Sequence, residues 1–163
     1  MTNKLKTAKN KKRGIALYVA VTVTGILVLV SFAVISLAIR QLSISSSSRD
    51  SQAAFYAADS GIECALYWDV KGVGGQSAFA TSTVNQISCG DTTNNPGNSN
   101  ISVGGSMTSS FHLDFLPEPF CADVSVTKDY VSGLPTTHIE SRGYNNCDPN
   151  NLRRVERAIK ADY

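Results

Sequence analysis

Charged residues are scarce in this chain of 163 residues: Asp, Glu, Lys and Arg make up 17% of it, against about 25% in an ordinary soluble domain. Ser, Thr, Asn and Gly fill the deficit, so the chain is polar without being charged. Plentiful aromatic and β-branched residues exclude a disordered polyelectrolyte, and the lack of any recurring period excludes a repeat array. The length favours one modest domain with an appendage.

Catalytic and metal-binding motifs are also missing. The chain has no GxSxG, HExxH, phosphate-binding loop or GxGxxG sequence. It has no CxxC pair, and His112 and His138 are not at ligand spacing, which argues against zinc. Both histidines fall opposite apolar residues on expected strands, which predicts surface side chains. We expect no catalytic residues, no resident metal and no cofactor, with an exported hydrolase as the most distant alternative.

Basic charge is confined to the start of the sequence. Residues 1–13 carry six basic residues and no acidic one, a balance of +6, whereas residues 14–163 carry nine basic and thirteen acidic residues, a balance of −4. Nucleic-acid binding requires basic and aromatic residues spread over a folded face, and no such pattern is present. We therefore expect no nucleic-acid partner, and a short basic arm in front of an acidic body.

A long apolar run follows the basic arm. Residues 15–39 read IALYVAVTVTGILVLVSFAVISLAI, 25 residues without a charge. As a helix this run would span about 38 Å, more than the roughly 30 Å hydrocarbon core of a bilayer. The run predicts a membrane-spanning helix, and the positive-inside rule puts residues 1–13 in the cytoplasm and residues 40–163 outside. A secretory signal cut near Ser36–Ala38 is the alternative, but its apolar region would be only about 7–15 residues long.

The helix is expected to continue beyond the membrane surface. Residues 40–68 form an amphipathic segment, and we expect a continuous helix over residues 15–68. A run of serines at residues 45–48 is its weak point, because serine hydroxyls compete for backbone hydrogen bonds and favour a bend or local melting. Apolar residues recur at helical spacing and predict the stripe that packs against the rest of the fold: Phe55, Ala58, Ile62, Ala65 and Leu66.

Residues 69–110 have the composition of a loop region. They are rich in Gly, Ser, Asn and Thr, and only residues 78–87 suggest a short regular element. A calcium site is a further possibility here, because side-chain oxygens gather at Asp91, Asn94, Asn95 and Asn98. The spacing is not that of a regular calcium loop, and a single acidic residue supplies little charge.

Residues 111–163 alternate apolar and polar side chains as strands do. The alternation is clear over residues 111–115, 122–130 and 137–144, whereas the C-terminal segment fits a strand or a helix. We expect an antiparallel sheet of three or four strands, with the preceding helix covering one face. The predicted fold class is therefore α+β: a long N-terminal membrane-spanning helix packed on a small antiparallel sheet, the head.

Four cysteines lie on the expected outer side of the membrane, which predicts two disulfides. Three pairings are possible. We favour Cys64–Cys89, which would tie the loop region to the helix, and Cys121–Cys147, which would staple the sheet. Each would contribute about 3 kcal/mol through restriction of the unfolded chain.

The order of these segments resembles that of type IV pilin-like proteins. The junction KKRG-IALYVAVTVTG looks like a prepilin leader, residues 1–14, and the resemblance implies cleavage by prepilin peptidase between Gly14 and Ile15, with methylation of the new terminus. The stretch RDSQAAFYAADSGIECAL is similar to the N-terminal region of minor pilins of the PilX type. The resemblance covers residues 11–68 and is architectural beyond them, where it implies a pilin-like head.

One position departs from the family pattern. Most major pilins have a glutamate at the fifth mature position, where this chain has Val19. An ionised carboxylate in lipid is costly unless it is paired, and the chain resembles tip-type minor pseudopilins that also lack the acid. Simple tolerance of valine in this lineage is the alternative explanation.

The resemblance implies a minor structural subunit of a type IV pilus, at or near the tip. The implied partners are the bilayer, prepilin peptidase, other pilins and pilus assembly platform proteins. The implied location is the bacterial inner membrane, with a single pass, and then an extracellular filament involved in cell adhesion. Two alternatives stay open: a pseudopilin of a type II secretion or DNA-uptake system, and an unprocessed, anchored extracellular binding domain.

Overall fold

The computed structural model describes residues 12–90, 93–131 and 134–163. Within these residues the fold is α+β with antiparallel sheets, which confirms the predicted class. The elements are α1 (Lys12–Val70), β1 (Val84–Ile87), η1 (Pro96–Asn98), β2 (Ile101–Gly104), β3 (Thr108–Asp114), β4 (Cys121–Val131), β5 (Leu134–Tyr144) and β6 (Glu156–Asp162), where η1 is a short 3₁₀ helix.

The chain divides into two compact units, residues 1–46 and 47–163. We call them the helix unit and the head unit. Helix α1 contributes residues to both, and the division falls within the serine run at residues 45–48. All four serines are helical, so local melting is not found there. The helix ends at Val70, two residues beyond the expected end at Trp68.

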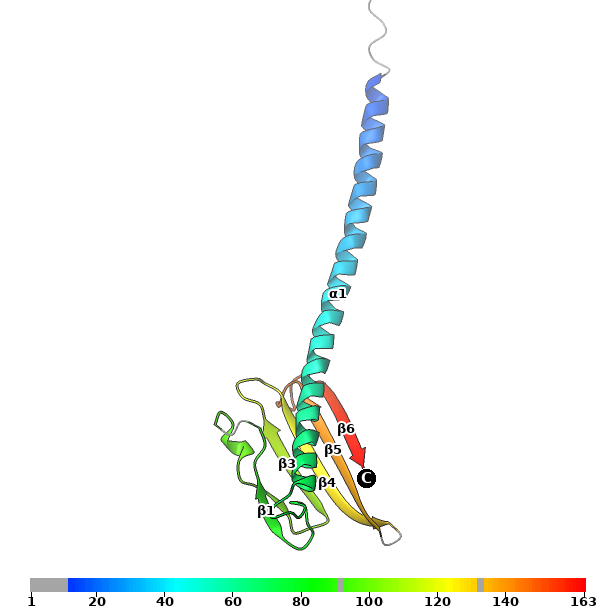
Figure 1. The fold of residues 1–163 in the computed structure, drawn as a ribbon. Coiled ribbons are helices and arrows are strands. Elements are labelled where there is room, and N and C mark those ends of the chain that lie inside the picture. The colour runs from blue at the N-terminus through cyan, green and yellow to red at the C-terminus, as the bar shows by residue number, and fades with distance from the viewer. Residues whose placement is uncertain (1–11, 91–92, 132–133) are drawn as a thin grey trace, which may run out of the picture. The chain divides into compact units, whose positions relative to one another are not determined.

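The head unit is built around one sheet of four antiparallel strands in the order β3-β4-β5-β6. Strands β4 and β5 form a long hairpin whose register runs from Cys121 opposite Tyr144 to Val131 opposite Leu134. Strands β1 and β2 form a separate antiparallel pair. Within this unit the last part of α1 lies across one face of the four-stranded sheet (Figure 1).

Alternation along the strands decides which side chains face the helix. In β3 the buried side chains are Ser109, Phe111 and Leu113, and the exposed residues between them point to the opposite face. The core combines this inner face with residues of α1 and of the loop region, and includes Ile62, Ala65, Phe79, Ile87, Val103, Phe111, Leu113, Val124, Val126 and Ile139. A sheet this small needs such a cover, because its other face is in water.

The structure corrects the description of residues 69–110 as a loop region. Strand β1 falls within the short element expected at residues 78–87, but β2 and the start of β3 at Thr108 were not expected. Strands β1 and β2 have four residues each, too few for a visible alternation, and glycine and serine surround them. The ambiguous C-terminal segment is a strand, since residues 156–162 pair with β5 from Tyr144 to His138.

Candidate functional site

The first candidate site is the apolar surface of the helix unit. From Ile15 to Ile44 the large hydrophobic side chains of α1 are exposed, with values between 49% and 72%. Leu29 and Phe32, near the middle of the apolar run, are both 71% exposed. Contiguous apolar surface of this extent marks a site for lipid or for other protein chains.

Polar groups in this part of the helix are satisfied locally. The Thr22 hydroxyl donates to the Val19 carbonyl at 2.9 Å, and the Ser31 hydroxyl donates to the Leu27 carbonyl at 2.8 Å. Thr24 donates in the same way to the Ala20 carbonyl at 2.9 Å. In lipid a polar group must find its partner within the protein, and these hydroxyls do so within their own helix.

One helix among the described residues, Ile15–Val70, is long and apolar enough to cross a membrane. The predicted cleavage residues lie at its start: Gly14 is within α1, and the Ile15 side chain is 68% exposed. The expected leader, residues 1–14, lies mostly outside the described residues. Cleavage between Gly14 and Ile15 therefore stays a prediction.

Within the head unit, the last part of α1 packs against the four-stranded sheet mainly through small residues. Ala54, Ala57, Ala58, Ile62 and Ala65 are all buried, at 5% exposure or less. Gly61 lies on the same side, and a Cβ atom there would come within 2.8 Å of Val124 Cγ2. Across the contact, a Cβ atom at Gly143 of β5 would overlap backbone atoms of Ala54 and Ala58. Helix and strand therefore touch backbone to backbone.

This contact corrects part of the predicted apolar stripe. Ala58, Ile62 and Ala65 are buried, and Leu66 is partly buried against the core, but Phe55 is 48% exposed. Phe55 pairs edge to face with exposed Tyr56, with ring centroids 6.2 Å apart. The prediction was wrong for Phe55 because it followed side-chain apolarity, whereas the helix turns its smallest side chains toward the sheet so that the backbones can approach.

Beside this contact lies a buried polar network that the sequence reading missed. The Asp69 carboxylate, at the end of α1, accepts hydrogen bonds from Lys128 Nζ at 2.5 Å, from the Tyr163 hydroxyl at 2.5 Å and from the Ser77 hydroxyl. Lys128 Nζ also donates to Thr137 Oγ1 at 2.8 Å. A signal was available, because Lys128 alternates in phase with Val124 and Val126, whose side chains face the core.

The network fixes the ionisation of the Asp69 carboxyl group. Burial by itself would raise its pKa, but hydrogen bonds from Lys128, Ser77 and Tyr163 and the positive charge of Lys128 lower it below the usual value. Burial, together with the hydrogen bond to the Asp69 carboxylate, raises the pKa of Tyr163. At neutral pH the network is therefore an ion pair with hydroxyl donors, and it joins the helix end to β4 and to the last residue after β6.

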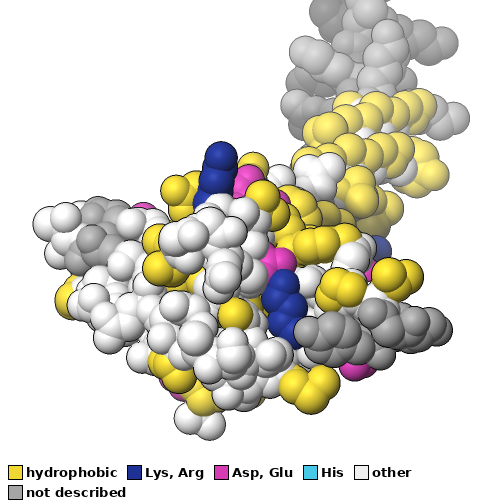
Figure 2. Space-filling view, turned by 60° about the horizontal axis from the view of Figure 1, so that its bottom comes forward, with side chains coloured by type: hydrophobic (Ala, Val, Ile, Leu, Met, Phe, Trp, Pro, Cys, Tyr) yellow, Lys and Arg dark blue, Asp and Glu magenta, His cyan; other side chains and the backbone are white. Residues whose placement is uncertain are grey.

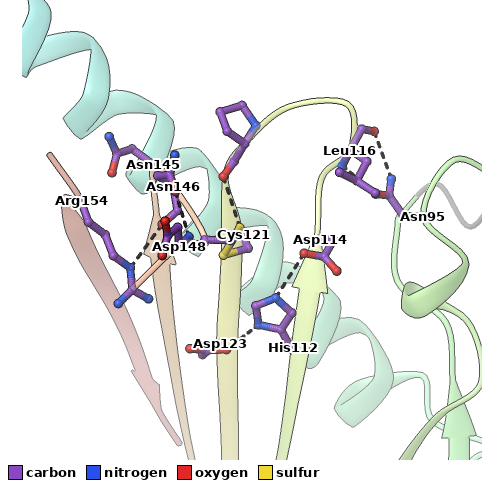
Figure 3. The surroundings of a disulfide bond; sticks show 12 residues. Asn95, His112, Asp114, Leu116, Cys121, Asp123, Asn145, Asn146, Asp148 and Arg154 are labelled. Carbon is purple, nitrogen blue, oxygen red and sulfur yellow. Dashed lines mark hydrogen bonds and ion pairs between the residues drawn. A yellow bond between two sulfur atoms is a disulfide. The ribbon is translucent and has the colours of Figure 1, made fainter. Parts of the chain in front are cut away.

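Two disulfides staple the head unit. Cys64 of α1 is bonded to Cys89, with Cα atoms 5.8 Å apart, and Cys121 of β4 is bonded to Cys147, with Cα atoms 5.7 Å apart. These are the two pairings favoured from the sequence. The first joins the helix to the loop after β1, and the second joins the start of β4 to the loop between β5 and β6, shown in Figure 3.

Two residues of the suggested calcium site have a structural role. Asn95 accepts from the Leu116 amide at 2.6 Å, and Asn98 accepts from the Asp114 amide at 3.0 Å while donating to the Asp114 carbonyl at 2.7 Å. Their side-chain oxygens are thus engaged by backbone amides at the end of β3 and in the loop that follows it. Asp91 lies outside the described residues, and the described residues contain no group of three or more His, Cys, Asp or Glu suited to a metal.

The outer face of the four-stranded sheet is polar. His112 Nδ1 lies 2.6 Å from Asp123 Oδ1 and its Nε2 lies 3.3 Å from Asp114 Oδ1 (Figure 3), while His138 Nδ1 lies 2.7 Å from Asp162 Oδ1. Both imidazoles are about half exposed, as expected for surface side chains. Burial lowers the pKa of His112, but the two carboxylates raise it by more.

A shallow, open depression of about 560 Å³ lies on this face, with Ser110, His112, Ser125 and Arg142 among its lining residues. Elsewhere on the head unit, Figure 2 shows a surface that is mostly uncharged and polar, with scattered hydrophobic side chains. The arrangement suits hydrogen-bonded contacts with another surface.

Comparison of the chain with protein-family models, with curated proteins and with solved structures finds no match. The type IV pilin-like resemblance therefore rests on the sequence motifs alone.

Proposed function

We propose that this chain is a minor structural subunit of a type IV pilus or a related filament. In this proposal residues 15–39 hold the unassembled subunit in the inner membrane as a single pass, with residues 1–13 in the cytoplasm. Prepilin peptidase removes the leader after Gly14, and platform proteins then move the subunit into the filament. The observation that carries the proposal is the exposed apolar surface of α1 from Ile15 to Ile44.

This exposed apolar surface supports the proposal because the helix of a filament subunit has to be stable both in the bilayer and in the filament. In the bilayer its apolar side chains contact lipid, and its hydroxyl groups bond to its own carbonyls, as those of Thr22, Thr24 and Ser31 do. In a filament the same side chains contact the helices of other pilins, and small residues such as Gly25 allow close approach. A Cβ atom at Gly25 would meet nothing within 4 Å, so this position is open to a neighbour.

Val19 supports a minor role at or near the tip. A bulk subunit pairs its buried carboxylate with the next subunit's terminal amine, as the family resemblance implies, and Val19 offers no such group. A subunit with no neighbour above it has no terminal amine to pair with, so valine in place of glutamate loses no ion pair. Valine also avoids the cost of an unpaired carboxylate in lipid.

Filament assembly also requires the head to stay attached to its helix under load. The backbone contact at Gly61 and Gly143, the Asp69 network and the Cys64–Cys89 disulfide all join α1 to the sheet or to its loops within the head unit. These links support a subunit that is moved by its helix. A pseudopilin of a secretion or DNA-uptake system would use the same chemistry with a different machine.

The proposal is tested by substituting the junction glycine in the native host. We expect Gly14→Leu to block processing and to remove the subunit from sheared filaments while leaving it in the membrane fraction. Gly97→Ala, in the head unit, is the control, because a Cβ atom there meets nothing within 4 Å, and it should be processed and recovered in filaments normally. Normal processing and normal filament recovery of the Gly14→Leu variant would contradict the proposal and would favour an unprocessed anchored domain.

A further inference from the structure

Strand β6 forms one edge of the four-stranded sheet. It pairs with β5 on one side, and none of the described residues pairs with its other side. In Figure 1 it lies at the margin of the head unit, with no helix or strand beyond it. An edge of this kind presents a row of backbone N–H and C=O groups that can pair with another chain.

Alternation along β6 decides which backbone groups are open. Val155 accepts from the Asn145 amide at 3.2 Å, and Tyr163 exchanges hydrogen bonds with Thr137 at 2.7 and 3.1 Å. In an antiparallel ladder every second residue bonds to a given neighbour, so the odd-numbered residues of this segment bond to β5. The N–H and C=O groups of the even-numbered residues therefore point away from β5, toward the open side.

The same alternation decides which side chains lie along this edge. Ile159 and Ala161 pack against the core, so they face the helix. Glu156, Ala158 and Lys160 therefore lie on the outer face, and all three are exposed. Charged residues on an edge strand usually discourage pairing. Here their order along the strand is acidic, small and basic, which is complementary to itself when the strand is reversed.

A second copy of β6 can therefore pair with β6 about a two-fold axis at Ala158. Glu156 then lies opposite the partner's Lys160, and the open groups of three residues on each strand form about six hydrogen bonds. Moving the axis by one residue leaves Glu156 opposite the partner's Ala158 or Asp162, and moving it by two opposes two glutamates or two lysines. A shift of three residues opposes unlike charges again but overlaps only about three residues.

The surrounding charges do not oppose this pairing. With His138 counted as neutral, those on the outer side of β5, of β6 and just before β6 sum to zero in each copy: Glu140, Arg142, Arg154, Glu156, Lys160 and Asp162. Charges on β3 and β4 lie at least two strand spacings, about 10 Å, from β6, where salt screens exposed charges. On the inner side, Arg157 is directed to its own helix, since its Nε donates to Ser51 Oγ at 2.8 Å.

We propose that the open side of β6 is an interface between two copies of this chain, which pair antiparallel about Ala158. The pairing joins their two four-stranded sheets edge to edge. The Glu156–Lys160 pairs set the register, because exposed ion pairs contribute more to specificity than to affinity. The interface lies on the head unit alone. It is therefore independent of the proposed filament contacts of the apolar helix surface, and holds whether or not the leader is removed.

The test is oxidative crosslinking of the full chain in detergent. All four native cysteines are in disulfides, so Ala158→Cys introduces the only free thiol. In the proposed pair the two Cα atoms at this position would be about 5.5 Å apart, within the range of a disulfide. Two copies of Asp162 would be about 26 Å apart. We expect a crosslinked dimer for Ala158→Cys and none for the matched control Asp162→Cys, on the same strand and face.

Charge reversal tests the register. In the Ala158→Cys background, Glu156→Lys opposes two pairs of lysines across the interface. We expect it to lower the yield of crosslinked dimer, at protein concentrations where little dimer forms, about tenfold. Adding Lys160→Glu restores unlike charges in both pairs and should restore the yield. The Tm of each variant shows whether the head is still folded.

Several results would overturn the inference. Absence of a crosslink in the folded Ala158→Cys variant would contradict the interface, and equal yields for Ala158→Cys and Asp162→Cys would show random collision. A yield that does not respond to Glu156→Lys would assign the association to another surface. A double reversal no better than Glu156→Lys alone would contradict the register. None of these results bears on processing at Gly14, so the proposed filament role is tested separately.

Discussion

Of the two glycines at the contact between α1 and the sheet, Gly61 and Gly143, we expect Gly143 to tolerate an added methyl group less well. Its Cβ atom would overlap backbone atoms of Ala54 and Ala58 in α1. Backbone cannot rotate away as a side chain can, so α1 and β5 must move apart. Overpacking of this kind costs about 1–3 kcal/mol, and the rigid obstacle puts Gly143→Ala at about 3 kcal/mol.

Alanine substitutions at two other glycines give a scale for this loss of stability. At Gly61 the nearest atoms, in Ser141 and Val124, belong to side chains that can adjust, and alanine is favoured over glycine inside a helix by about 1 kcal/mol. We therefore expect Gly61→Ala to cost about 1 kcal/mol. Gly97 is the matched control, since a Cβ atom there meets nothing within 4 Å, and Gly97→Ala should stay within about 0.5 kcal/mol of the wild type.

The assay is thermal unfolding of the full chain in detergent with both disulfides intact, followed by near-UV circular dichroism. A loss of about 3 kcal/mol corresponds to a fall in Tm of roughly 10 °C for a unit of this size. Tm should be highest for Gly97→Ala, lower for Gly61→Ala and lowest for Gly143→Ala. A Gly143→Ala variant as stable as Gly97→Ala would refute the backbone contact between helix and sheet.

Three further predictions concern the network, the disulfides and the apolar run. Asp69→Asn should cost about 3 kcal/mol at neutral pH because it leaves the partly buried Lys128 ammonium without its counter-charge. Since the folded pKa of Asp69 is lowered from 3.8, its contribution is present above pH about 4 and is lost as the pH falls through the folded pKa, so urea unfolding of variant and wild type should converge in acid. The Cys121→Ser/Cys147→Ser variant should lose about 3 kcal/mol of unfolding free energy in urea. An unchanged urea midpoint would show that the loop between β5 and β6 does not need the disulfide. Leu29→Lys, in the middle of the apolar run, should weaken membrane insertion by about 3 kcal/mol and release the chain on carbonate extraction, whereas Leu42→Lys beyond the run should not.

Much of the fold could be predicted because its signals are local. A run of 25 uncharged residues and the alternation along β3, β4 and β5 are legible in the sequence. The short strands β1 and β2 were missed because four residues among glycines and serines carry no measurable period. The final strand was ambiguous because its apolar residues fit strand alternation and also a helical spacing through Leu152, Val155 and Ile159, and its pairing with β5 decided it.

The packing of the helix could be predicted only in part, because it depends on two surfaces at once. Apolarity selected Phe55, but the absence of a side chain at Gly143 makes room for Ala54 and Ala58 instead. The Asp69–Lys128 pair is formed by residues 59 positions apart, and only an unexpected Lys128 at a core-facing strand position pointed to it. The roles of Asn95 and Asn98 likewise became clear only from their partners in another segment.

The mass of the N-terminus, measured on protein from its own membranes with and without prepilin peptidase, tests the central proposal most directly. We predict a mature chain that begins at methylated Ile15 in the presence of the peptidase and an intact leader in its absence. An intact leader in both strains would contradict the filament proposal and leave an anchored extracellular domain. A chain that begins near Ile39 would show that the apolar run is a secretory signal, and would contradict both the anchoring and the continuous role of α1.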